Sequence, residues 1–133
     1  MKRVHYSTGT PWEPLVGYSR AVRVGNVIHV SGTTAIDENG EVISPENSFL
    51  QTEAILKKIQ TAIEYLGGRI EDVVRTRIYV VNIQDWEQIG RAHGEIFRNI
   101  RPASTMVEVQ SLISPFLLVE IEAEAIVVPI SNL

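Results

Sequence analysis

The 133-residue chain contains no cysteine. This absence excludes disulfide bonds, thiolate metal sites, iron–sulfur clusters and a cysteine nucleophile, and it fits a reducing compartment. The chain also lacks an apolar run approaching the ~18 residues that span a bilayer. Its first residues, Met1 to Glu13, are polar and contain no signal-peptide core. We therefore expect a cytoplasmic protein with no membrane partner.

Sequence motifs for several kinds of chemistry are missing as well. The chain has no GxxxxGK[ST], GxGxxG or GxSxG pattern, so phosphate-loop, dinucleotide and esterase functions have no support. The three histidines, at positions 5, 29 and 93, form no HxH or HxxxH pair, which argues against a metal site. The reactive groups that remain are carboxylates, hydroxyls and arginines.

Basic residues are missing from the end of the chain. The 12 Lys and Arg all lie at or before Arg101, and 16 Asp and Glu give a net charge of -4. The acidic residues beyond Arg101 are Glu108, Glu120, Glu122 and Glu124. This balance argues against a nucleic-acid partner. The length fits a single domain over residues 1–133.

Hydrophobic periodicity and turn residues predict two helices and five or six strands. Residues 9–17, with two prolines, are expected to form an irregular loop. The predicted elements are a hairpin (18–24 and 27–31, turning at Gly25-Asn26), a helix from an N-cap at Ser48 to Gly67-Gly68, a strand (74–81), a helix opened by an Asp85/Gln88 capping box, and strands at 105–110 and 118–128. The apolar stripe of the second helix consists of Ile89, Ala92, Ile96 and Phe97. This order predicts an α+β fold in which both helices cover the apolar face of a mixed sheet.

The other face of that sheet is expected to be polar. Glu120, Glu122 and Glu124 alternate with apolar residues, so they share one face at intervals of about 6.6 Å. Arg75 and Arg77 share a face of the strand 74–81. This face either stays open to water or meets equivalent sheets of other subunits around an axis. A glutamate shielded from water there has a raised pKa and suits acid–base catalysis, whereas a hydrated or ion-paired glutamate is structural.

Other candidate residues also have two interpretations each. His93 lies beside the apolar stripe and is either a helix–sheet contact or a catalytic base. Arg77 either pairs with a glutamate or binds a substrate carboxylate. Ser31 and Ser104, at strand ends, either cap backbone groups or bind a ligand. Tyr18, beside the proline-rich loop, is either a core residue or a pocket wall.

Four segments together resemble the RidA (YjgF-type) family of reactive-intermediate deaminases. They are GYSRAVRVGNVIHVSG, VVRTRIYVVNI, RPASTMVEV and LVEIEAEAI, and the resemblance runs from about Gly17 to Val127. It implies a chorismate-mutase-like α+β fold, with a mixed sheet and two helices on one face. It also implies a homotrimer with inward-facing sheets and small-molecule pockets between subunits. Typical members hydrolyse 2-imino acids or their enamine tautomers to 2-keto acids and ammonia, with no metal or organic cofactor.

Carried over by motif, the resemblance assigns roles to particular residues. Glu120 is implied to position or activate water, and Tyr18 and Ser31 to line the pocket. The arginine that holds the substrate carboxylate in typical members is Ser104 here, and Met106 stands where many members have a smaller residue. A serine supplies neither the charge nor the bidentate geometry of arginine, so Arg77 or Arg101 is a possible substitute.

Two functional hypotheses follow. The first is a RidA-like hydrolase that acts on small reactive imines or enamines, with Glu120 orienting water. The second, which the serine at position 104 favours, is a noncatalytic trimer that binds a small metabolite or has a regulatory role. A chorismate-mutase-like activity is a weaker third hypothesis, because its dianionic substrate requires several convergent cations and only Arg75 and Arg77 are evident.

Overall fold

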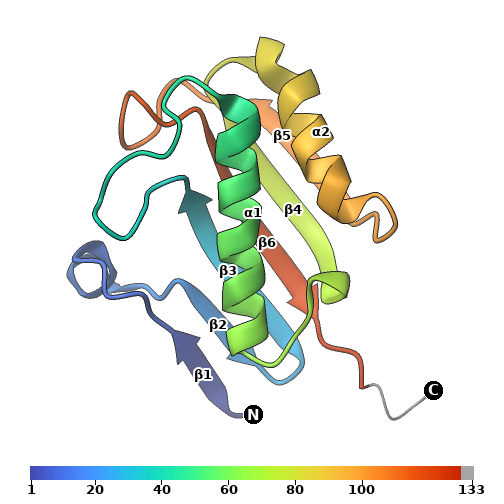
Figure 1. Cartoon of the computed structure of the whole chain (residues 1–133). Helices are drawn as coiled ribbons and strands as arrows, with labels where there is room; N and C mark the ends of the chain where they lie inside the picture. The colour runs from blue at the N-terminus through green and yellow to red at the C-terminus, as the bar shows by residue number, and fades with distance from the viewer. Residues whose placement is uncertain (130–133) are drawn as a thin grey trace.

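The computed structural model describes residues 1–129, which form one six-stranded mixed sheet and two α-helices (Figure 1). In chain order the elements are β1 (Arg3–Tyr6), a π-helical turn η1 (Glu13–Gly17), β2 (Ala21–Val24), β3 (Val27–Thr34), α1 (Ser48–Tyr65), a 3-10 turn η2 (Ile70–Asp72), β4 (Val73–Val80), a 3-10 turn η3 (Ile83–Asp85), α2 (Trp86–Phe97), β5 (Ala103–Glu108) and β6 (Val119–Ile126). The α+β class expected from the sequence is confirmed.

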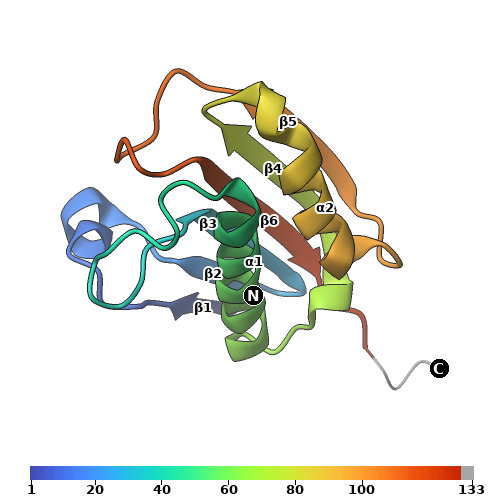
Figure 2. The same cartoon turned by 45° about the horizontal axis from the view of Figure 1, so that its top comes forward.

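The strand order across the sheet is β1-β2-β3-β6-β4-β5. β6, the last strand in the chain, lies antiparallel between β3 and β4, so the acidic strand occupies the middle of the sheet (Figure 2). β4 and β5 are the parallel pair, joined by a crossover that contains α2. A register shift interrupts the β3–β6 pairing between Val30 and Thr33. Gly32, within this irregularity, lies against the side chain of Glu120.

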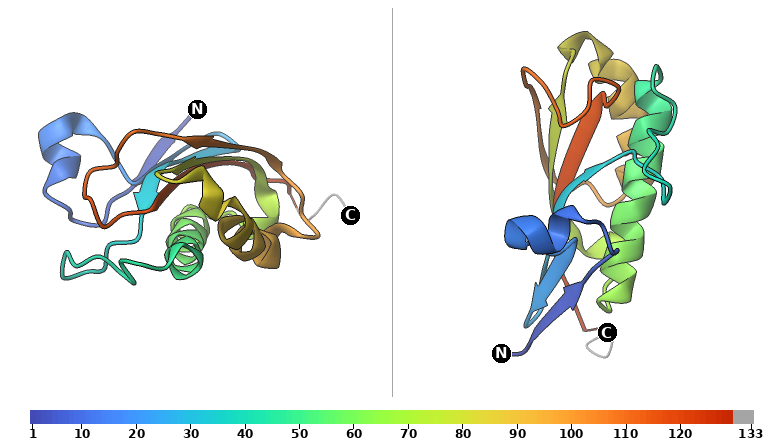
Figure 3. Two further views of the ribbon diagram at one scale, coloured as in Figure 1. Left: turned by 90° about the horizontal axis from the view of Figure 1, so that it is seen from above. Right: turned by 90° about the vertical axis from the view of Figure 1, so that its left-hand side faces the viewer.

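Both α-helices cover the same face of the sheet, as predicted, and within residues 1–129 the opposite face carries no α-helix (Figure 3). The alternation on β6 explains the arrangement, because its apolar residues are buried against the helices while its glutamates point the other way. The fully buried residues of α1 and β6 that form the centre of the core are Ile55, Ile59, Ile63, Val119, Ile121 and Ala125.

The beginning of the chain differs from the prediction. β1, which short-range periodicity did not reveal, pairs with β2 and forms one edge of the sheet. The expected irregular loop at 9–17 contains a π-helical turn, closed by a bond from the Tyr18 amide to the Glu13 carbonyl (2.9 Å). The Glu13 carboxylate is buried and accepts hydrogen bonds from the hydroxyls of Thr8 (2.7 Å) and Thr10 (2.9 Å). Glu13 therefore orders a segment that its prolines alone predict to be irregular.

The helix starts also need correction. The N-cap of α1 is Asn47, whose Oδ1 accepts from the Leu50 amide (2.9 Å), and Ser48 is already helical and buried. The predicted Asp85/Gln88 capping box is wrong, because the Asp85 side chain makes no capping bond. The chain enters α2 through η3 instead. Of the predicted apolar stripe, Ile96 is 38% exposed while the other members are buried.

Other predicted features are confirmed. The hairpin turns at Gly25 (φ 60°) and Asn26, and α1 stops at Gly67 in the left-handed region (φ 88°). The strands predicted at 74–81, 105–110 and 118–128 are β4, β5 and β6, displaced by one or two residues at their ends.

Candidate functional site

The helix-free face of the sheet is polar because β4 and β6 bring their charged residues into register. Arg75 pairs with Glu124, Arg77 with Glu122, and Tyr79 with Glu120 across the antiparallel ladder. Cross-strand neighbours on one face lie close enough for direct side-chain contact. The predicted polar face is therefore present, and it places opposite charges beside each other.

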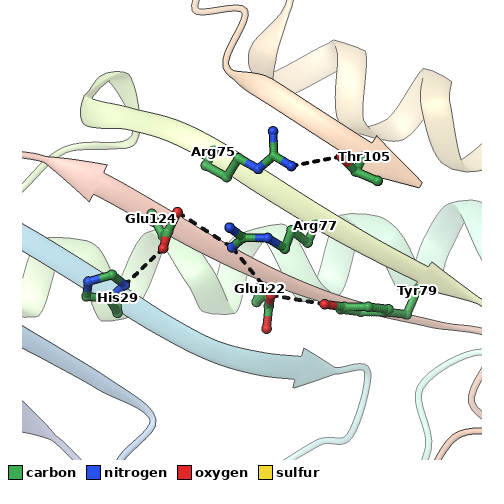
Figure 4. A network of polar contacts seen from close by, with 7 residues as sticks. All are labelled: His29, Arg75, Arg77, Tyr79, Thr105, Glu122 and Glu124. Atoms are coloured by element: carbon green, nitrogen blue, oxygen red, sulfur yellow. Dashed lines mark hydrogen bonds and ion pairs between the residues drawn. The ribbon is translucent and has the colours of Figure 1, made fainter. Parts of the chain in front are cut away.

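A network of polar contacts crosses this face (Figure 4). Arg77 Nη1 lies 3.5 Å from an oxygen of Glu122 and 3.5 Å from one of Glu124. Tyr79 donates to Glu122 (3.0 Å), and His29 Nδ1 lies 3.2 Å from Glu124. The pairing of Arg77 with glutamate is thus confirmed. Burial, followed by the bond to Glu122, raises the pKa of Tyr79, so the phenol remains a donor at neutral pH.

A concavity of about 430 Å³ adjoins this network. Its lining contains the predicted pocket residues Tyr18, Ser31 and Arg77, but Glu120 is not part of it. The remaining lining residues are Arg3, His5, Gly17, Ser19, Val22, His29, Val30, Glu122, Ala123 and Glu124. The Ser31 hydroxyl donates to the Ser19 carbonyl (2.6 Å), which fixes the end of the hairpin. The structure therefore brings the predicted hairpin residues to the polar face of the sheet.

Glu120 lies against Gly32, at the bulge of β3. A side chain at position 32 would overlap the Glu120 carboxylate, since a Cβ atom there would lie only 3.0 Å from its Cδ. Glycine at position 32 thus makes room for the carboxylate. Burial raises the pKa of Glu120, the positive charge of Arg20 opposes that rise, and Glu122 adds to it. The carboxylate is consequently a stronger proton acceptor than an exposed one.

Arg20 is a residue of this region that the sequence analysis did not single out. Its Nη2 donates to the carbonyls of Ser31 (3.2 Å) and Gly32 (2.7 Å) and to the hydroxyl of Thr33 (2.8 Å). Its guanidinium carbon lies 5.8 Å from the centroid of the Tyr18 ring. A sequence signal that could have identified Arg20 is its distance from Tyr18. Arg20 follows Tyr18 by two residues, and residues two apart in an extended segment share a side.

Ser104 and Met106 occupy a different part of the subunit. Both lie on β5 beside Thr76 and Ile78, which are residues of the helix-covered face. Thr76 Oγ1 donates to Ser104 Oγ (2.8 Å), and Met106 packs against the core. Within one subunit, these two residues are therefore separated from Tyr18, Ser31 and Arg77 by the sheet.

His93 is the helix–sheet contact that one of its two interpretations predicted. Its Nε2 lies 3.0 Å from Thr76 Oγ1, and its ring packs 4.6 Å from that of Phe97. Burial lowers the pKa of His93, so the imidazole is neutral at physiological pH. Ser104, Thr76 and His93 thus form one hydrogen-bonded chain from β5 to α2.

Among residues 1–129, no three His, Asp or Glu side chains lie together in a way that would hold a metal ion. No helix in that range has the length and apolar character required to cross a bilayer.

Comparisons with known proteins agree with one another. The family model "Endoribonuclease L-PSP" matches residues 8–127. RutC of Acinetobacter baylyi, a 3-aminoacrylate deaminase, is 32% identical over 124 residues, which cover 93% of this chain and 97% of RutC. SCO2049 of Streptomyces coelicolor is 38% identical over 119 residues, covering 89% of this chain and 87% of that protein. The crystal structure of Rv2704 from Mycobacterium tuberculosis, a member of the YjgF/YER057c/UK114 family, has a TM-score of 0.86 at 44% identity and covers 95% of this chain and 100% of its own.

These matches confirm the resemblance seen in the four sequence segments, and with it the chorismate-mutase-like fold. They support a deaminase-type role at the level of the family, which includes a named deaminase and bears the description of an endoribonuclease. The chain belongs to the endoribonuclease L-PSP family, the family of the YjgF and RidA proteins.

Proposed function

We propose that this protein hydrolyses small reactive imines or enamines that carry a carboxylate, releasing a carbonyl compound and ammonia. The observation that carries the proposal is the placement of Glu120, a half-buried carboxylate held over Gly32 beside Arg20. Burial raises its pKa, and general bases work best when their pKa approaches the working pH. The deaminase among the relatives, RutC, is consistent with this chemistry.

In the proposed reaction, a water molecule adds to the carbon of the protonated C=N bond. Glu120 accepts a proton from that water as the C–O bond forms, giving a tetrahedral carbinolamine. The protonated Glu120 then returns the proton to the amino group. As the C–N bond breaks and ammonia leaves, the Glu120 carboxylate takes the proton of the carbinolamine hydroxyl, the carbonyl forms, and ammonia carries that proton away as ammonium. The scheme uses no metal and no organic cofactor. Tyr18 and Ser31 line the neighbouring concavity, which would hold the part of the substrate that is not in contact with Glu120.

We also propose that the working unit is a homotrimer with the pockets between subunits. No α-helix of the described residues covers the polar face of the sheet, and the edge strand β5 is mostly exposed. An edge strand that packs on a neighbouring subunit would bring Ser104 and Met106 toward that subunit's Glu120, Tyr18 and Arg77. Light scattering after gel filtration tests this arrangement, because three chains of 14.9 kDa give about 45 kDa.

The test of the function is turnover of 2-iminopropanoate, generated in situ from alanine by an amino-acid oxidase. The protein is expected to accelerate its hydrolysis above the spontaneous rate, and Glu120→Gln to lower kcat by roughly 100-fold or more. Glu53→Gln, at an exposed position of α1, is the matched control and should leave turnover unchanged. Equal turnover by Glu120→Gln and the natural protein would rule out the proposed role of Glu120.

The same experiment separates the enzyme from the second candidate, a trimer that binds metabolites without catalysis. Ser104 favours that candidate, because it stands in place of the arginine that the family resemblance implies. Saturable binding of small acids without any acceleration of imine hydrolysis would establish the binding function. Incubation with RNA under the same conditions tests the activity named in the family description.

A further inference from the structure

Ser104, Thr76 and His93 are joined by two hydrogen bonds that lead from the surface to the interior. Thr76 Oγ1 lies 2.8 Å from Ser104 Oγ and 3.0 Å from His93 Nε2. Ser104 is exposed on β5, whereas Thr76 is fully buried on β4. β5 is the last strand at its edge of the sheet, so within residues 1–129 only β4 flanks it. The chain of hydrogen bonds therefore ends at an open edge, on a hydroxyl that a ligand can reach.

The hydroxyl of Thr76 has one hydrogen and two neighbours, so the direction of one bond determines the direction of the other. If His93 Nε2 carries a hydrogen, it donates to Thr76, and Thr76 donates to Ser104. The hydrogen of Ser104 is then free for a ligand. If Nε2 carries none, both bonds form only when Thr76 donates to His93 and Ser104 donates to Thr76, which leaves lone pairs alone on Ser104. The tautomer of a histidine on α2 thus decides whether Ser104 is a donor or an acceptor.

The structure favours the arrangement in which Ser104 is a donor. Thr76 donates to Ser104, so His93 Nε2 has to supply the hydrogen of the other bond. Within residues 1–129, His93 Nδ1 bonds to no protein atom, and no buried side-chain nitrogen or oxygen lacks a partner. Nδ1 therefore reaches water, which donates to it. Both ring nitrogens of a neutral imidazole are satisfied in this way.

A hydroxyl that accepts a hydrogen bond is a stronger donor, because successive bonds in a chain polarise one another. Ser104 therefore offers one directed donor without a charge. A carboxylate oxygen accepts from such a donor, and so does the neutral carbonyl oxygen of an amide or ester. An arginine at this position would instead favour the anion through its charge. Ser104 hence suits ligands with either kind of oxygen.

We propose that His93 and Thr76 are positioning residues, which hold the Ser104 hydroxyl as a donor to an oxygen of the substrate. This role rests on the proposed function and on the proposed trimer, in which β5 of a neighbouring subunit approaches Glu120. It extends the substrate class from small imino acids to their amides and esters. Neither positioning residue touches the substrate, since both act through Ser104.

The direction of the chain is tested by nitrogen-15 NMR of the His93 ring in the natural protein. We expect the hydrogen of the neutral imidazole on Nε2 and none on Nδ1. Adding pyruvamide should shift the Nε2 signal, and this shift should vanish in Ser104→Ala. A hydrogen on Nδ1 instead, or a shift that survives in Ser104→Ala, overturns the proposal.

Calorimetry with pyruvate and pyruvamide tests the binding role of Ser104, because these ligands carry a charged and a neutral group at the same position. Ser104→Ala is expected to weaken binding of both by about fivefold, the effect of one ordinary hydrogen bond. Thr76→Val should weaken both by about threefold, and the double variant should bind no more weakly than Ser104→Ala alone. Thr52→Val is the matched control, since Thr52 is also fully buried and donates one hydrogen bond, to the Ser48 carbonyl (2.8 Å). It should change neither affinity.

Several results overturn the proposal: unchanged affinity in either single variant, additive losses in the double variant, a loss confined to pyruvate, or no binding of either ligand by the natural protein. If Thr76→Val does not fold, the NMR comparison of the natural protein with Ser104→Ala decides. Binding that depends on Ser104 and Thr76 without imine turnover refutes only the proposed function. Imine turnover by a protein whose affinities do not change in Ser104→Ala refutes only the role of Ser104.

Discussion

Replacement of Gly32 by alanine tests the placement of Glu120 with the smallest possible change. The backbone of Gly32 is not in the left-handed region, so alanine is tolerated there apart from its contact with Glu120. The added methyl group would overlap Oε2 and come within 3.0 Å of Cδ. The carboxylate must therefore withdraw by about 1 Å, a displacement that costs roughly 100-fold in rate at a catalytic group.

Stability should change much less than activity. The atoms that have to move are the end of a flexible side chain, so the loss in unfolding free energy is expected to be about 1 kcal/mol. The assay is kcat/KM for 2-iminopropanoate generated in situ, together with urea unfolding of the same preparations. Gly90→Ala is the control, because a methyl group on that glycine of α2 meets no atom within 4 Å. It should leave turnover unchanged and stabilise α2 by about 0.5–1 kcal/mol.

Turnover of the imine by Gly32→Ala at the rate of the natural protein would refute this prediction. Such a result would mean that the position of the Glu120 carboxylate over Gly32 is irrelevant to the reaction. A large loss of unfolding free energy in Gly32→Ala, with turnover lost because the protein is unfolded, would also contradict the prediction. The added methyl group contacts only the end of the Glu120 side chain, so it should not unfold the protein.

Two further predictions concern the scaffold. Asn47→Ala removes the capping bond to the Leu50 amide and should lower the unfolding free energy by about 1 kcal/mol in urea, more than Ser48→Ala, which removes no capping bond. Burial lowers the pKa of His93 below its ordinary value of 6.5. As the pH falls through 6.5, the imidazole therefore becomes protonated in the unfolded chain before it does so in the folded protein. This difference in proton binding lowers the unfolding free energy. The unfolding free energy of the natural protein relative to His93→Gln should thus be larger at pH 8 than at pH 5; an equal difference at both values would contradict this.

Much of the fold was predictable because the signals are local. The alternation of Glu120, Glu122 and Glu124 with apolar residues determines which face of β6 meets the helices, whatever the neighbouring strands are. Gly25 and Gly67 have positive φ angles that few other residue types adopt, so they mark a turn and the end of a helix. The N-terminal features were less accessible, since β1 depends on pairing with β2 and η1 depends on Glu13 reaching back to Thr8.

The candidate site was predictable only in part, because its geometry arises from contacts between distant segments. Tyr18, Ser31 and Arg77 were found from their types and positions, and they line one concavity. Arg20 acquires its surroundings from the β3 bulge, which the pattern of residues does not reveal. Ser104 was placed by motif, whereas its side chain bonds to Thr76 in this subunit. Whether it meets a pocket depends on a neighbouring subunit, as the proposed trimer requires.

A crystal structure of the protein soaked with pyruvate tests the central claim most directly. We predict that pyruvate lies beside Tyr18 and Ser31, with its carbonyl carbon facing Glu120 across the space of one water molecule. Pyruvate bound away from Glu120 would contradict it.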